Sequence, residues 1–291
     1  MITDSVRVCP DFQRRRVLCL LGGAALLLGS TLAHAAPAAA TSAPAGPALT
    51  QIDLINLAVR QRTLIQRMTK LYAQILVGAR TTDAKRLIQE AISRFDTLHT
   101  THKSAASGMG STNYQVTAVL DKISKAWAKL HVDIAKAPTE KALPDICSQC
   151  EDLSRLINQS TGASAQFLSG SPIGQLVDRS GKQCYLSQRI AKNYFLRALG
   201  QSAEEASREI NDARKEFIDN ATFLAKAPEN TTEIKFLLQL GATQWPYFDD
   251  AVSQSHKSST DLDYNVATTA ENILEVLERT NLLYFKLSSS T

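Results

Sequence analysis

The feature of this sequence that most constrains its fold is a segment that occurs twice. Residues 55–78 and 177–200 align without gaps at an offset of 122 residues (177 minus 55). Each copy places charged and amide side chains inside a strongly apolar helical pattern, which is unfavourable unless those side chains find partners. The repeat therefore predicts one structural unit used twice. The matched positions in the first copy are Arg60, Gln61, Leu64, Gln66, Arg67, Lys70, Tyr72 and Gly78, and their counterparts are Lys182, Gln183, Leu186, Gln188, Arg189, Lys192, Tyr194 and Gly200.

The composition favours a helical protein. The 291 residues suffice for one or two domains with a core. Aromatic residues make up 6%, and long stretches are rich in Ala, Leu, Lys, Gln and Glu, as is typical of helices. The formal net charge is +4, of which residues 1–35 contribute +2 (four Arg against two Asp). With about +2 left and no basic block, nucleic acid is excluded as a partner.

The N-terminus is typical of an export signal. Three arginines at 14–16 precede an apolar run at 17–32 and a small-x-small cleavage site at 33–35. We therefore expect residues 1–35 to be a cleavable signal peptide and the protein to be periplasmic. An uncleaved membrane anchor is the alternative, although the apolar run is shorter than the ~20 residues that span a bilayer. Residues 36–49 form a Pro/Ala linker.

Capping signals predict eight helices. The first helix has a capping box from Thr50 to Asp53 and a terminating glycine at Gly78. Further helices are expected to begin near Thr82, Thr112, Asp145, Ser171, Ser202, Asn230, and Asp261 or Asp263.

Landmarks outside the repeated segment agree with a duplication. Trp127 and Trp245 each lie mid-way along the third helix of their half, and Glu151 corresponds to the acidic position 271 at an offset of 120 residues. Four helices joined by short loops predict antiparallel neighbours. The expected fold class is all-α, with two tandem up-down four-helix bundles at residues 50–168 and 171–291, from an internal duplication of about 120 residues.

Polar side chains flank the apolar stripe of the first helix. Arg60 and Arg67, seven apart, lie on one flank, whereas Arg62 and Gln66, four apart, lie on the other. A guanidinium suits small oxyanions because it is always charged and offers planar, forked donors. These residues, with Arg189 of the second copy, are therefore candidates for ligand binding. The alternative is that the arginines are solvated or form ion pairs with neighbouring helices.

The same positions resemble a known family. The first copy has Ile55, Asn56, Ala58, Arg62 and Arg67 of the family's first-helix motif, but Val59 where the family has Gly. The second copy has Gly181, Ser187, Gln188 and Arg189, but Cys184 where the family's first Arg belongs. The pattern resembles the extracytoplasmic N-terminal sensor module of PilJ-type chemotaxis transducers and NarX-like nitrate/nitrite sensor kinases, in two tandem copies.

The resemblance implies a helical bundle that pairs with a second bundle around a small ligand. In the nitrate sensors, the arginine at the Arg62 position meets its dimer mate around a small anion. Cys184 cannot supply the second positive charge that a two-arginine clamp needs within one chain. The resemblance therefore implies a clamp formed by the Arg62 residues of two chains in a homodimer. It implies a non-catalytic module that binds a nitrate- or nitrite-like anion and passes the signal to a membrane receptor or envelope partner. The alternative is a helical scaffold of an envelope chemosensory or pilus system, with structural arginines.

Cysteine and histidine pairs are the remaining candidates. Cys147 and Cys150 lie in the first turns of a helix, whose dipole is expected to lower the pKa of Cys147. In an oxidising compartment a local disulfide is the leading expectation, with a redox role or free thiols as alternatives. Cys184 is left over, either buried or available for an intermolecular bond. His99 and His102 are expected at an exposed helix end rather than in a metal site.

No catalytic pattern is present in the sequence. It has no serine elbow, glycine-rich phosphate loop or HExxH motif, so we expect neither an enzyme nor a cofactor or metal. The two tryptophans are expected in the core rather than around a ligand.

Overall fold

The first helix begins and ends where its sequence predicts. The Thr50 side chain accepts a hydrogen bond from the backbone N–H of Asp53, and the Asp53 carboxylate accepts one from the backbone N–H of Thr50. The helix ends at Gly78, whose φ of 89° lies in the left-handed region that glycine adopts without strain. The predicted capping box and terminating glycine are both confirmed.

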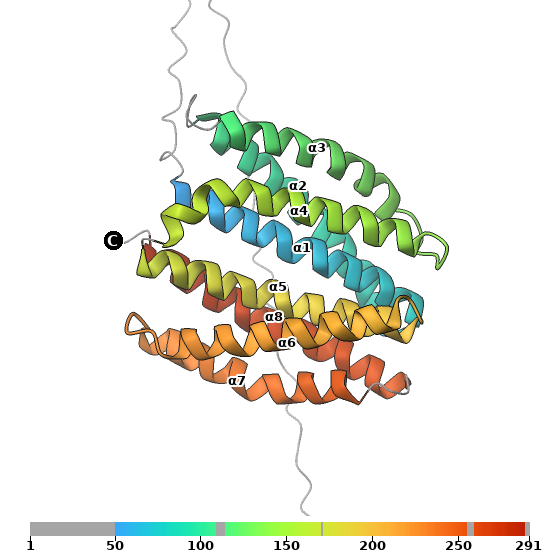
Figure 1. Cartoon of the computed structure of the whole chain (residues 1–291). Helices are drawn as coiled ribbons and strands as arrows, with labels where there is room; N and C mark the ends of the chain where they lie inside the picture. The colour runs from blue at the N-terminus through green and yellow to red at the C-terminus, as the bar shows by residue number, and fades with distance from the viewer. Residues whose placement is uncertain (1–49, 109–113, 170, 255–258, 289–291) are drawn as a thin grey trace, which may run out of the picture. The chain divides into compact units, whose positions relative to one another are not determined.

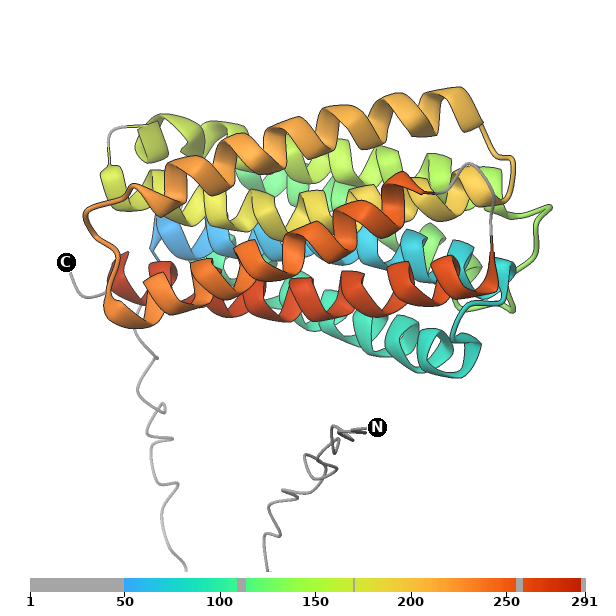
Figure 2. The same cartoon turned by 90° about the horizontal axis from the view of Figure 1, so that it is seen from below.

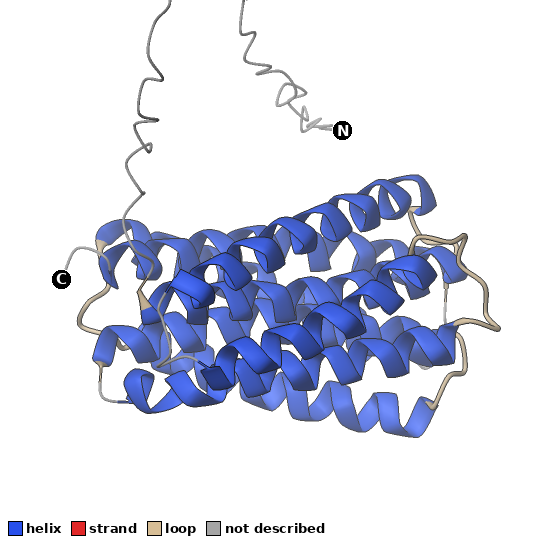
Figure 3. Ribbon diagram, turned by 90° about the horizontal axis from the view of Figure 1, so that it is seen from above, coloured by secondary structure: helices blue, strands red, loops and turns tan. Residues whose placement is uncertain are grey.

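The computed structural model describes residues 50–108, 114–169, 171–254 and 259–288. Within these ranges every regular element is a helix (Figure 3). The eight helices are α1 (Gln51–Val77), α2 (Thr81–Gly108), α3 (Tyr114–Ile134), α4 (Leu143–Ser169), α5 (Pro172–Ala198), α6 (Ala203–Ala225), α7 (Thr232–Ser253) and α8 (Thr260–Ser288).

The starts of the later helices agree with the prediction only in part. Ser171 caps α5 as expected. The cap of α7 is Thr231, because the expected residue, Asn230, is buried and donates instead to a backbone carbonyl at the end of α6. α6 begins directly after Ser202 as expected, but Ser202 adopts a left-handed conformation and its side chain makes no cap hydrogen bond. The expected cap of α3 at Thr112 lies outside the described residues.

α1 and α5 lie side by side and run in the same direction through the middle of the helical body (Figure 1). α1 also packs against α2 and α4, and α3 packs mainly against α4. The second half has the same neighbours, since α5 packs against α6 and α8, and α7 packs mainly against α8 (Figure 2). Consecutive helices alternate in direction, as an up-down arrangement requires.

The two central helices bury nearly all of their surface. Ala58 and Ile65 of α1 are fully buried, as are Ile190 and Ala191 of α5. A helix that is apolar on most sides has to be covered on most sides, and α1 and α5 cover each other. The sequence left open whether the two halves pack together. The structure joins them into one unit, residues 46–291, and a single apolar cluster includes side chains of both.

The closest approach of α1 and α5 depends on a glycine. A Cβ added at Gly181 would lie 2.2 Å from Cγ1 of Val59, which is far inside van der Waals contact. Val59 is the residue that departs from the family motif, and its side chain fills the space that Gly181 leaves. The two matched positions of the repeat therefore contact each other across the centre of the molecule.

The predicted signal peptide, residues 1–35, and linker, residues 36–49, lie outside the described residues. Among the helices that the structure describes, none combines the length and the hydropathy needed to cross a bilayer.

Candidate functional site

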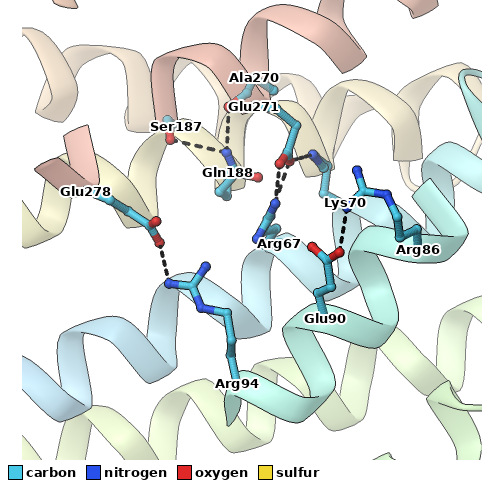
Figure 4. Close-up of polar contacts among 10 residues, drawn as sticks. All are labelled: Arg67, Lys70, Arg86, Glu90, Arg94, Ser187, Gln188, Ala270, Glu271 and Glu278. Carbon is cyan, nitrogen blue, oxygen red and sulfur yellow. Dashed lines mark hydrogen bonds and ion pairs between the residues drawn. The ribbon is translucent and has the colours of Figure 1, made fainter. Parts of the chain in front are cut away.

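Two cations of α1 share one carboxylate from the other half of the chain. Arg67 donates through Nε (3.3 Å) and Nη2 to Glu271 of α8, and Lys70 donates to the same carboxylate (Figure 4). The Lys70 side chain is completely buried and Arg67 nearly so. Arg67 thus has a carboxylate partner within the chain, as the ion-pair alternative expects.

Of the two corresponding cations of α5, Lys192 makes the reciprocal contact and Arg189 pairs within its own half. Lys192 donates to Glu151 of α4 at 2.6 Å, and Arg189 donates through Nε to Glu209 of α6 at 2.7 Å. Glu151 and Glu271 are the acidic residues that correspond at an offset of 120. Each lysine of the repeat therefore reaches the matching glutamate of the opposite half, which links the halves by charge as well as by packing.

The shared carboxylate remains ionised because of its neighbours. Burial alone would raise the pKa of Glu271, but the charges of Lys70 and Arg67 outweigh it and lower this pKa to about 2. Burial lowers the pKa of Lys70, and the charge of Glu271 opposes that change. Buried ion pairs of this kind add little net stability, although removing one partner is costly because the other charge stays buried.

Arg62 has a different environment. Its Nη1 donates to Oδ1 of Asn158 on α4 at 2.9 Å, and its Nε is buried without a hydrogen-bond partner. Among the described residues it forms no ion pair. The guanidinium carbons of Arg62 and Arg189 lie 5.9 and 5.8 Å from the ring centroid of Tyr185. Burial lowers the pKa of Arg62, and the charge of Asp178 partly opposes this.

The remaining two predicted ligand residues point to different places. Gln66 faces α4, where its Nε2 lies 3.5 Å from Oγ of Ser154, and its Oε1 is buried without a partner. Arg60 is exposed and lines a groove of about 290 Å³ with Arg94 and Glu278, which pair with each other at 3.2 Å. Burial and then the charge of Arg94 lower the pKa of Arg60.

The structure therefore divides the predicted site. Arg62 and Gln66 both face α4, as their shared flank of the helix predicts. Arg60 and Arg67 also share a flank, since Arg60 lines a groove bordered by α8 and Arg67 pairs with Glu271 of the same helix. The clamp between Arg62 of two chains remains a prediction.

The cysteines do not form the expected disulfide. Cys147, Cys150 and Cys184 are free thiols. Burial raises the pKa of Cys147 to about 11 and that of Cys150 to about 12. The predicted lowering of the Cys147 pKa was therefore wrong, because desolvation of the thiolate outweighs the helix dipole. Cys184 is buried, as one of its two alternatives predicted.

The two histidines are buried rather than exposed. His102 Nδ1 lies 3.0 Å from Oε1 of Gln61, and Nε2 of the same glutamine lies 3.4 Å from Nδ1 of His99. The other nitrogen of His99 lies 2.8 Å from Oγ of Ser124 on α3. The expectation failed because the polar residues around the two histidines suggested an exposed face. Gln61, a polar residue on the apolar stripe of α1, was the signal that a buried polar partner was needed.

Comparison with known proteins identifies one matched region. Residues 53–151 match the family model described as "Type IV pili methyl-accepting chemotaxis transducer N-term" (PilJ). The match covers α1 to α3 and the first turns of α4, and it includes Arg60, Arg62, Gln66 and Arg67. No curated protein and no solved structure matches the chain.

Proposed function

We propose that this chain is a non-catalytic sensor module that binds a small planar anion, such as nitrate or nitrite, at Arg62. The match of residues 53–151 to the N-terminal domain of a chemotaxis transducer supports the sensor role. The proposal includes an extracytoplasmic location, with residues 1–35 as the export signal, and transfer of the signal to a membrane receptor. It also includes the origin of the two halves from one duplicated unit, which the matching helix neighbours support.

The observation that carries the proposal is that Arg62 forms no ion pair with any described carboxylate, although the charge of Asp178 acts on it from a distance. Arg67 and Arg189 each have a carboxylate partner, whereas Arg62 contacts only the neutral Asn158 and Tyr185 in the described part of the chain. A partly buried guanidinium without a counter-charge is unfavourable. A small oxyanion would supply that charge and a partner for the unpaired Nε.

Calorimetry and thermal denaturation of the purified protein with nitrate, nitrite and acetate test this site. A ligand at 100 times its Kd stabilises the fold by about 2.7 kcal/mol. We expect Arg62→Ala to abolish this stabilisation and Arg62→Lys to weaken it, because lysine keeps the charge but loses the fork. Arg86→Ala is the control, since Arg86 is exposed and pairs only with Glu90 on its own helix. A response that survives Arg62→Ala, or no response to any anion, contradicts the site.

A scaffold role is the second candidate. The ion pairs of Arg67 and Arg189 support it, because two of the five proposed ligand residues already have carboxylate partners. Phe236 and Tyr247 of α7 are 61% and 69% exposed and offer an aromatic surface for an envelope protein. This role predicts co-purification with a membrane partner that survives Arg62→Ala and is lost in Phe236→Asp/Tyr247→Asp.

A further inference from the structure

A cavity of about 400 Å³ lies between α6 and α7, far along the chain from Arg62. These two helices make few contacts with each other, and the cavity extends between them as far as α5 and α8. Most of its lining is apolar, including Leu237, Leu277 and Phe217. The rings of Phe217 and Trp245 stack on each other at 4.0 Å with an interplanar angle of 14°, and this aromatic pair forms part of the cavity wall.

A buried amide lines the same cavity. Gln183 of α5 is only 2% exposed, and its Nε2 donates to the backbone carbonyl of Phe217 at 2.7 Å. This bond fixes the orientation of the amide, because the atom next to a carbonyl oxygen has to be the nitrogen. The other atom, Oε1, is therefore an acceptor, and it is buried without a hydrogen-bond partner. Buried acceptors in folded proteins rarely lack a donor.

The first half of the chain shows what satisfies this amide. The counterpart of Gln183 in the repeat is Gln61, whose Oε1 lies 3.0 Å from Nδ1 of His102. His99 then bridges α2 to α3 through Ser124 at 2.8 Å. Imidazole rings thus occupy the space between α2 and α3, and one of them donates to the glutamine.

The second half has small or apolar residues at the matching positions. The ring pairs Phe95–Trp127 and Phe217–Trp245 align α2 with α6 and α3 with α7, at offsets of 122 and 118 residues. At these offsets His99 and His102 correspond to Ala221 and Leu224, and Ser124 corresponds to Ala242. Ala221, Leu224 and Ala242 all line the cavity. The small side chains of Ala221 and Ala242 leave part of this space open, and Leu224 has no donor for Oε1 of Gln183.

We infer that the cavity between α6 and α7 binds a small, flat, mainly apolar molecule that carries one hydrogen-bond donor. Its ring lies against the Phe217–Trp245 wall, and its N–H or O–H donates to Oε1 of Gln183. The volume falls within the range of small-molecule pockets, in which a few polar groups orient a largely apolar ligand. This site is separate from the proposed anion site at Arg62.

Calorimetric titration of the purified protein with indole, and with 1-methylindole as the matched probe without the donor, tests the inference. We expect indole to bind with one site per chain and at least tenfold more tightly than 1-methylindole. Ala242→Leu fills the cavity and is expected to weaken indole binding at least tenfold. Arg62→Ala is expected to leave it unchanged, so failure here and failure of the anion proposal are distinguishable.

A swap between the halves gives the sharper test. Ala221→His/Leu224→His/Ala242→Ser rebuilds the first-half arrangement around Gln183 and is expected to abolish indole binding. His99→Ala/His102→Leu/Ser124→Ala empties the first-half position and is expected to create a second indole site. Circular dichroism checks that each variant is folded, and the single variant Ala242→Leu decides the matter if a triple variant is not.

Three results would overturn the inference. The first is the absence of heat from indole binding to the parent protein up to the solubility of indole. The second is equal affinity for indole and 1-methylindole. The third is unchanged indole affinity in folded Ala242→Leu.

Discussion

Gln61 has hydrogen-bond partners on both ends of its amide, whereas its counterpart Gln183 has a partner on one end only. The helices around the two glutamines have the same neighbours in the same order. The difference comes from residues on the next helices, His102 in one half and Leu224 in the other. The same helical framework therefore accommodates a filled polar core in one half and a hollow in the other.

A second contrast concerns the reciprocal ion pairs. Glu271 is mostly buried and serves two cations, whereas Glu151 is more than half exposed and pairs with Lys192 alone. Glu151 is thus more accessible to water than Glu271, although the two carboxylates hold matching positions in the two halves. The contrast teaches that equivalent pairs need not contribute equally to stability.

The largest effect on the free energy of unfolding is expected from the removal of Glu271. Glu271→Ala leaves the buried charges of Arg67 and Lys70 without a counter-ion, so we expect a loss of about 3–5 kcal/mol in the free energy of unfolding. Glu151→Ala leaves one buried cation, Lys192, instead of two, so we expect a smaller loss of about 1–3 kcal/mol. Urea denaturation of both variants measures the difference, and equal losses would contradict the asymmetry.

The next effect tests the contact between the matched positions of α1 and α5. Gly181→Ala places a methyl group against Val59 and is expected to cost about 1–3 kcal/mol through overpacking. Val59→Ala in the same chain is expected to restore most of that loss. Gly241→Ala is the matched control, because a Cβ there meets only Val276 at 3.8 Å, and helix propensity then favours alanine by about 0.5–1 kcal/mol. Similar losses in the two glycine variants would contradict the close approach.

The buried His102 of the first half predicts a pH dependence that Leu224 at the matching position cannot provide. Burial, and then the charge of His99, lower the pKa of His102 from 6.5 to about 4. The folded state therefore favours the neutral ring, so stability is complete above pH 6.5 and falls as the pH drops toward 4. At pH 5 the loss is about 2 kcal/mol.

Comparison with His102→Leu, which copies Leu224, isolates this contribution. Denaturation at pH 7.5 and pH 5 is expected to show a smaller difference between the two pH values in the variant. The window lies above the range in which Glu271 titrates, since the pKa of Glu271 falls from 4.5 to about 2 in the folded state. An unchanged pH dependence in the variant would show that His102 does not titrate as its burial implies.

The smallest effect concerns the thiols of α4. Cys147 and Cys150 correspond to Ala267 and Ala270 of α8 at the offset of 120 residues. Cys147→Ala/Cys150→Ala is expected to cost about 1 kcal/mol, since only two small buried side chains are shortened. Because both thiols are free, a reductant is expected to leave the melting temperature of the parent protein unchanged. A drop in melting temperature on reduction would indicate the disulfide that the structure lacks.

The sequence by itself determined the helices and the repeated framework. Helix ends depend on local groups such as Thr50, Asp53 and Gly78, whose roles follow from residues within one turn. The internal match between residues 55–78 and 177–200 likewise predicted which side chains would have equivalent places. The shared flank of Arg62 and Gln66 was predictable for the same reason, since helical periodicity alone fixes it.

Only the tertiary structure decided which polar group meets which partner. The packing of α1 on α5 brings Glu271 to Lys70 across about 200 residues of sequence, and no local pattern encodes that distance. The packing of α1 on α5 also decides that Val59 needs Gly181, and the packing of the other helices decides that Cys147 is desolvated and that His99 and His102 are covered. Burial and long-range pairing arise only when separate helices pack together, so their contributions to stability cannot be inferred from the local sequence.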